Sequence, residues 1–236
     1  SMEKPHSIYL VSLAIGAFTE LSDCFEDIPL SFFVPEGKEE EGQRSFEKTA
    51  DIIKFFSEKT RIRYPYPQYS QVIAQDFIFG GMENTGATTM YEHILIDERA
   101  AIDIDSDDLI AHELAHQWFG DLVTMEWFDD VWMKEVFANF MAAKIVNPSF
   151  PEVDHDLRFL LAHYPPAYVV DRTAGANPIR QPLDNLNNAG TLYGAIIYQK
   201  APIVMKHLEL LLGADPFRDG LDRKSTRLNS SHSSVS

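Results

Sequence analysis

The stretch His112-Glu113-Leu114-Ala115-His116, followed after eighteen intervening residues by Glu135, carries the most information in this chain. Histidines four positions apart lie on one face of a helix, about 5–6 Å from each other, and can hold one small cation. Two imidazoles and one carboxylate form a zinc set that leaves a fourth position open to water. Glu113 lies between the histidines, where a carboxylate can take a proton from that water. The alternative is a helix with two surface histidines in an accidental pattern, and the downstream Glu135 favours the metal site.

The sequence around this motif predicts two helices that bring the ligands together. Ser106 is a good N-cap for a helix over residues 107–119. A second helix is expected over residues 131–146, where Pro148 ends it. This second helix would present Glu135 towards the histidine pair.

The rest of the chain mixes strand and helix patterns, which predicts an α+β fold. Runs rich in β-branched and aromatic residues predict strands over residues 6–18, 28–34, 71–79 and 88–97. Apolar residues at helical spacing predict helices over residues 43–60 and 189–212, the latter kinked or divided at Pro202. The turn region 35–42 is the expected boundary between a β-rich unit and the part that follows.

Composition excludes several kinds of site and partner. The 236 residues contain one cysteine, Cys24, so an internal disulfide and a cysteine-based zinc site are both excluded. The formal charge of −16 disfavours nucleic acid and anionic membranes as partners. No run of about 18 apolar residues is present, so no transmembrane segment is expected. The compartment and the oligomeric state stay open.

Both ends of the chain look unlike natural domain boundaries. Residues 222–236 are polar, basic and rich in serine, and the segment DRKSTRLNSSH resembles a sequencing-library adapter translated as coding DNA. We expect this tail to be non-native and to carry no function. The N-terminus enters a strand-like run almost immediately, so we expect the chain to be a fragment of a longer protein.

Three motifs in the chain together resemble the aminopeptidase N family of zinc metallopeptidases, the gluzincins. They are HELAHQWFGDLVT at 112–124, WFDDVWMKEVFANF at 127–140 and the upstream GGMEN at 80–84. The resemblance spans about residues 6–212. It implies a thermolysin-like catalytic domain, mainly helical with a small sheet, preceded by a β-domain. The expected divisions are residues 1–42 for the end of the β-domain, 43–221 for a truncated catalytic domain and 222–236 for the tail.

The resemblance also implies a role for each motif residue. His112, His116 and Glu135 are the expected ligands of one zinc ion per chain, and Glu113 is the expected general base. The GGMEN motif is the expected substrate-binding segment, made of Gly80, Gly81, Met82, Glu83 and Asn84. In the family its glutamate binds the free α-amine of the substrate, and two glycines let backbone approach a ligand closely. Taken alone, GGMEN could be a turn with a solvated glutamate.

A tyrosine and two aspartates complete the candidate site. The segment from Ile197 to Met205 resembles the part of the family that carries a catalytic tyrosine, which assigns that role to Tyr198, with Tyr193 as its rival. A phenol can donate a hydrogen bond to the oxyanion of the tetrahedral intermediate. Asp121 or Asp130 could orient a ligand imidazole, although surface or capping roles are the commoner fate of such residues.

Three residues depart from the family pattern. Val136 stands in place of a glycine beside the ligand Glu135, Pro202 occupies a position usually held by glycine, and Asp121 stands where asparagine is frequent. These changes bear on substrate preference and remove no catalytic group.

The function expected from the sequence is zinc-dependent removal of the N-terminal residue from peptides that carry a free amine. Two alternatives stay open. One is an epoxide-opening or bifunctional zinc hydrolase of the same family, and the other is a non-catalytic peptide-binding relative.

Overall fold

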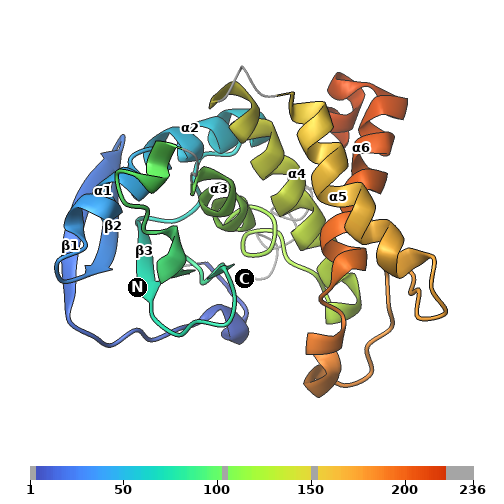
Figure 1. Ribbon diagram of the computed structural model, residues 1–236, viewed down its shortest axis with the longest axis horizontal. Coiled ribbons are helices and arrows are strands. Elements are labelled where there is room, and N and C mark those ends of the chain that lie inside the picture. The colour runs from blue at the N-terminus through green and yellow to red at the C-terminus, as the bar shows by residue number, and fades with distance from the viewer. Residues whose placement is uncertain (1–3, 103–105, 150–153, 222–236) are drawn as a thin grey trace, which may run out of the picture. The chain divides into compact units, whose positions relative to one another are not determined.

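The computed structural model describes residues 4–102, 106–149 and 154–221 (Figure 1). The chain forms two compact units that divide between Leu122 and Val123. The expected non-native tail, residues 222–236, lies outside the described residues.

One mixed sheet forms the β part of unit 1. Within the described residues its five strands have the order β1-β2-β3-β5-β4. They are β1 (Phe18–Phe25), β2 (Ile28–Pro35), β3 (Tyr69–Ala74), β4 (Gly81–Met82) and β5 (Ala87–Tyr91). β1 pairs antiparallel with β2, whereas the β2–β3 and β3–β5 pairs are parallel. β4 pairs antiparallel with β5, with Gly81 opposite Met90, so the GGMEN motif lies at a sheet edge.

The strand predictions are partly correct. The strand expected over 28–34 is confirmed as β2. The strand expected over 6–18 is wrong, because that stretch contains a 3₁₀ helix at Ile8–Leu10 and β1 begins only at Phe18. Leu13 and Ile15 are 84% and 86% exposed, so this apolar run lacks the buried face that stabilises a strand.

The two later strands are shorter than predicted because local turns end them. β3 stops at Ala74, and Asp76 follows with a left-handed φ of 53°. β5 stops at Tyr91 and is followed by the 3₁₀ helix Glu92–Ile94.

The helices of unit 1 are α1 (Glu39–Phe46), α2 (Thr49–Thr60) and α3 (Asp107–His116), with a 3₁₀ helix at Ala100–Ile102. The helix predicted over 43–60 is therefore two helices. α1 starts earlier than predicted, with three glutamates in its first turn that interact favourably with the helix dipole. Phe46, Ile53 and Phe56 are buried, as their helical spacing predicted.

Aromatic side chains hold α3 in the core of unit 1. Trp118, two residues after the end of this helix, is 2% exposed, and its indole nitrogen donates to the Ile62 carbonyl oxygen at 2.9 Å. Its ring makes edge contacts with Phe56 and Tyr64, at centroid distances of 5.8 and 5.5 Å. Aromatic pairs of this geometry stabilise a core beyond their buried area.

The start of α3 also uses its polar residues for tertiary contacts. Ser106 occupies the N-cap position, as predicted, but its hydroxyl donates to the Ser45 carbonyl oxygen at 3.2 Å instead of capping the helix. Asp107 pairs with Lys48 at 2.5 Å. These contacts join α3 to the helices before it in the sequence.

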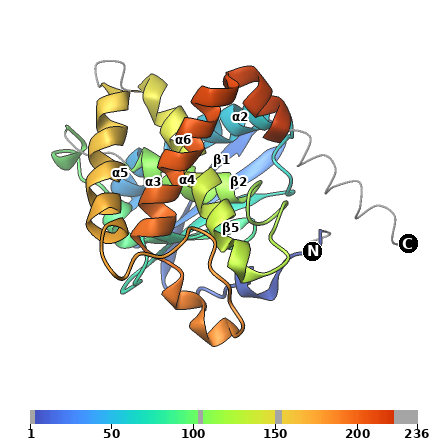
Figure 2. The same ribbon diagram turned by 90° about the vertical axis from the view of Figure 1, so that its right-hand side faces the viewer.

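Unit 2 is mainly helical. Its helices include α4 (Val131–Ser149), α5 (His155–Asp171) and α6 (Ala201–Leu212), with 3₁₀ helices at Phe128–Asp130 and Leu186–Thr191 and a π-helix at Ile196–Lys200. Figures 1 and 2 show α4, α5 and α6 alongside one another. Val131, Leu183, Leu192 and Ile197 form a buried cluster that packs the start of α4 against the segment before α6.

The helix predictions for unit 2 differ from the structure at positions that contain proline. α4 is confirmed, but it continues to Ser149, past the expected stop at Pro148. The helix expected over 189–212 is divided, and Pro202 lies in the first turn of α6, where a missing N–H costs little. α5 was not predicted, and it contains Pro165 and Pro166.

The α+β class predicted from the sequence is confirmed by one small sheet and a helical majority. The domain boundary predicted in residues 35–42 stays a prediction, and residues 18–35 share the sheet of unit 1 with β3 and β5. In the described ranges, the structure contains no helix with the length and apolar character needed to span a bilayer.

Candidate metal and catalytic site

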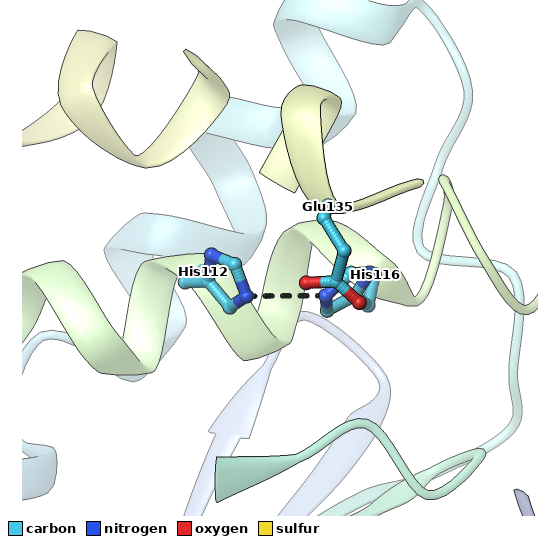
Figure 3. Close-up of side chains that lie close together, drawn as sticks. All are labelled: His112, His116 and Glu135. Atoms are coloured by element: carbon cyan, nitrogen blue, oxygen red, sulfur yellow. Dashed lines mark hydrogen bonds between the residues drawn. The ribbon is translucent and has the colours of Figure 1, made fainter. Parts of the chain in front are cut away.

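The two histidines of the motif face one another on α3. Their Nε2 atoms are 3.2 Å apart and their ring centroids are 4.8 Å apart, with the ring planes nearly perpendicular (Figure 3). His116 is 1% exposed and His112 is half-buried. The i, i+4 spacing thus produces two converging nitrogen atoms, as the sequence predicted.

A backbone contact fixes the orientation of His116. Its Nδ1 lies 3.0 Å from the carbonyl oxygen of Phe119. A carbonyl oxygen can only accept, so Nδ1 carries a proton, and Nε2 is the ring nitrogen that a neutral imidazole would offer to a metal. This is the arrangement in which metal-binding histidines are normally held, with the second ring nitrogen donating to a backbone carbonyl.

Glu113 packs against the GGMEN strand. A Cβ atom added to Gly81 would lie 2.5 Å from Glu113 Oε1 and 2.6 Å from its Cδ. Real Cβ atoms do not come this close, so a larger residue at position 81 would require the Glu113 side chain to shift. Gly81 therefore allows β4 to pack closely against the Glu113 side chain.

Glu83, Glu113 and His116 form a buried cluster within unit 1. Each offers a donor atom within 4.8 Å of the others, and all three are at most 4% exposed. Two buried carboxylates at this separation repel each other unless a cation or a shared proton lies with them. The cluster is therefore suited to bind positive charge.

The remaining GGMEN residues have different surroundings. Gly80 is exposed, Met82 is half-buried, and Asn84 is 5% exposed. The backbone of Gly80 is held by the amide of Tyr91, which donates to its carbonyl oxygen at 2.9 Å.

Glu135 belongs to unit 2, where α4 holds it. It is 3% exposed and forms an ion pair with its neighbour Lys134, whose ammonium lies 3.1 Å from the Glu135 carboxylate. An adjacent ammonium favours the ionised form of a carboxylate, which is the form that binds a metal.

The two tyrosine candidates lie close together in unit 2. The rings of Tyr193 and Tyr198 are stacked, with centroids 6.2 Å apart, and both side chains are half-buried. Tyr198 lies in the π-helix Ile196–Lys200, a rare form that is frequent at functional sites. Because the two rings lie next to each other, both tyrosines remain candidates for the catalytic role.

The two aspartate candidates differ in their surroundings. Asp130 pairs with Arg180 at 2.7 Å, an interaction within unit 2 that raises the pKa of the guanidinium. Asp121 is 3% exposed, and its backbone amide donates to the His116 carbonyl oxygen at 3.0 Å. Asp121 is therefore the aspartate next to the histidine helix.

Comparison with protein families settles the relationship of the chain. Residues 44–232 match the Peptidase family M1 domain. The chain belongs to peptidase family M1. It is thus a member of the aminopeptidase N family, as its three motifs indicated.

Its M1 relatives are named as aminopeptidases and are much longer. The chain is 32% identical over 218 residues to "Probable aminopeptidase 2" of Sulfurisphaera tokodaii, covering 91% of this chain and 28% of the relative. It is also 32% identical to "Leucyl aminopeptidase" of Saccharolobus solfataricus, with the same coverage. It is 30% identical to "Endoplasmic reticulum aminopeptidase 1" of Mus musculus, covering 24% of that protein. The chain spans roughly a quarter of the length of these relatives.

Sequence reasoning missed two buried polar residues in this M1 chain. Lys134 is 6% exposed next to Glu135, and Gln117 is fully buried immediately after His116. The signal was available, because both are polar residues directly beside expected ligands within otherwise apolar stretches. Val136, the departure from the family glycine, is also fully buried, so its side chain adds to the packing of α4.

Proposed function

We propose that this chain carries the catalytic site of a zinc aminopeptidase that removes the N-terminal residue from peptides with a free amine. The observation that carries the proposal is the buried cluster of Glu83, Glu113 and His116, with His112 on the same helix. It combines a metal-binding imidazole, a candidate base and a second carboxylate suited to a cation. The names of the M1 relatives point the same way.

The residues fit one zinc ion. By the chemistry of their side chains, His112, His116 and Glu135 supply two imidazoles and one carboxylate, the donor set of a catalytic zinc. The protonated Nδ1 of His116 and the converging Nε2 atoms support this assignment. When bound, zinc supplies Lewis acidity, which polarises the scissile carbonyl and makes water more acidic.

Glu113 is proposed as the general base. Its carboxylate takes a proton from the attacking water and then gives it to the leaving amine. The close approach of Gly81 limits how far this side chain can move. A base held in this way keeps its carboxylate near the metal ligands throughout the reaction.

Glu83 is proposed as the anchor for the substrate's α-ammonium group. The carboxylate pair of Glu83 and Glu113 favours a cation, and an ammonium group at Glu83 offsets their repulsion. Anchoring the amine there allows only the first peptide bond to reach the catalytic groups. This geometry explains why the enzyme would act on the end of a chain.

Tyr198 is proposed to stabilise the oxyanion. Its phenol donates a hydrogen bond to the negatively charged oxygen of the tetrahedral intermediate. Its place in a π-helix supports Tyr198 over Tyr193. Because the two rings are stacked, each tyrosine is substituted in a separate variant to decide which one acts.

The test compares aminoacyl arylamides with a free amine and their N-acetylated counterparts, using the zinc-loaded full-length protein. We expect hydrolysis of the free-amine series only. Equal hydrolysis of both series would contradict the Glu83 anchor and indicate an endopeptidase or a broad hydrolase. Absence of hydrolysis despite bound zinc would favour the epoxide-opening or peptide-binding alternative.

A further inference from the structure

The turn that carries Glu83 is held by polar contacts that the proposed mechanism does not use. This turn, residues 83–86, joins β4 to β5 and is here called the Glu83 turn. The amide of Ala87 donates to the Asn84 carbonyl oxygen at 2.9 Å, and the amide of Asn84 donates to the Met82 carbonyl oxygen at 2.8 Å. Glu83 therefore lies on a tight, internally bonded connection.

Gln117 ties the far end of this turn to the histidine helix. The amide of Gly86 donates to Gln117 Oε1 at 2.9 Å, and the Gly86 carbonyl oxygen accepts from the amide of Ser70 at 3.0 Å. Gly86 has a left-handed φ of 71°, a conformation that favours glycine. Both backbone groups of Gly86 are thus occupied, one by the residue that follows the ligand His116.

Asn84 ties the turn at a second point. Its Nδ2 donates to the Leu10 carbonyl oxygen at 3.1 Å, and its Oδ1 accepts from the Thr89 hydroxyl at 2.8 Å. Both ends of the side-chain amide therefore bond to the protein itself. Buried amides satisfied in this way fix a local conformation, because breaking either bond leaves a polar group unpaired.

We propose that Gln117 is a positioning residue that holds the Glu83 turn at a fixed distance from the metal helix, with Asn84 as its second anchor. Gln117 is fully buried, and it bonds the turn one residue after His116. It thereby couples the site of the amine-binding carboxylate to the site of the metal. Asn84 acts on the turn instead of contacting the substrate. The inference rests on the proposed function, because it concerns how Glu83 is held in place as the proposed amine anchor.

The test measures how much a free amine contributes to binding. The probes are leucine hydroxamate and its counterpart without the amine, and affinities are measured by titration calorimetry on the zinc-loaded full-length protein. The affinity ratio is the affinity of the probe with the amine divided by that of the probe without it. Gln117→Met keeps the side-chain length but loses the acceptor. In this variant we expect the ratio to fall about five- to tenfold, as for one lost buried hydrogen bond. Zinc content and binding of the probe without the amine stay unchanged.

Two matched variants separate positioning from general stability. Gln117→Glu retains an acceptor for the Gly86 amide and is expected to keep the ratio. Thr85→Val is the control in the same turn, because the Thr85 hydroxyl is buried and has no hydrogen-bond partner among the described residues. It too is expected to keep the ratio. If Gln117→Met does not fold, Asn84→Ala is measured in its place, and the same fall in the affinity ratio of the two probes is expected.

An unchanged ratio in Gln117→Met would overturn the inference, as would equal weakening of both probes. A wild-type protein that binds both probes equally well would instead refute the amine anchor itself, and with it the proposed function.

Discussion

At the scale of single residues, a close contact in unit 1 constrains position 81 to glycine. The structure leaves no room for a Cβ atom there, because Glu113 occupies that space. The family resemblance assigned Gly81 to substrate binding. The packing adds a second reason for glycine, which is to let the edge strand and the Glu113 side chain lie against one another.

Gly81→Ala should therefore displace the Glu113 carboxylate. We expect kcat to fall by about 10²-fold, the usual cost of moving a catalytic group by about 1 Å. The measurement is steady-state hydrolysis of a leucyl arylamide, together with zinc content, which should not change. Gly190→Ala is the control, because a Cβ atom there meets nothing within 4 Å. Normal kcat in Gly81→Ala would show that Glu113 tolerates displacement and is not held by this contact.

At the scale of elements, the sequence predicted the parts of the site better than the connections between them. α3 and α4 were predicted because apolar spacing, the N-cap Ser106 and the metal motif agree. The tertiary contacts of Gln117 and Asn84 could not be predicted, because they join elements that are distant in the sequence.

The wrong strand and the missed helix have physical causes. Residues 6–18 have a strand-like composition, but most of their apolar side chains stay exposed, and composition alone cannot reveal whether a sheet partner exists. α5 contains Pro165 and Pro166, which normally argue against a helix interior. In the first case a strand-like composition finds no sheet partner among the described residues, and in the second a helix forms despite its prolines.

The aromatic core beneath α3 makes unit 1 sensitive to alkaline pH. Burial raises the pKa of the Tyr64, Tyr66 and Tyr69 phenols, and the negative charge of Asp121 raises each of them further. The folded state therefore keeps these phenols neutral, whereas in the unfolded chain they ionise near pH 10, as model tyrosines do. Their contribution to stability is present below about pH 10 and is lost as the pH rises above that value.

We expect this loss to appear as tyrosinate absorbance at 295 nm that rises together with unfolding measured by circular dichroism. Tyr64→Phe removes one such phenol and should make the alkaline decline in the free energy of unfolding less steep. Tyrosinate signals from these three residues well before unfolding would show that they are accessible to solvent.

At the scale of the whole molecule, the chain is strongly acidic, and unit 1 contains a buried pair of carboxylates, Glu83 and Glu113. The formal charge of −16 agrees with the proposed substrate, a peptide with a free amine, because a negative field attracts positive charge. The chain spans 28% of the length of the first archaeal relatives. The activity proposed here therefore concerns the full-length protein, and experiments on it are the relevant tests.

The most direct test of the account is the Glu113→Gln variant of the full-length protein, measured for zinc content and for hydrolysis of a free-amine leucyl arylamide. The account predicts one zinc per chain, as in the wild type, because Glu113 is not a proposed ligand. It predicts that kcat falls by about 10²–10⁴-fold, the usual contribution of a general base. Zinc retained together with wild-type turnover would contradict the assignment of Glu113 as the base and, with it, the proposed mechanism.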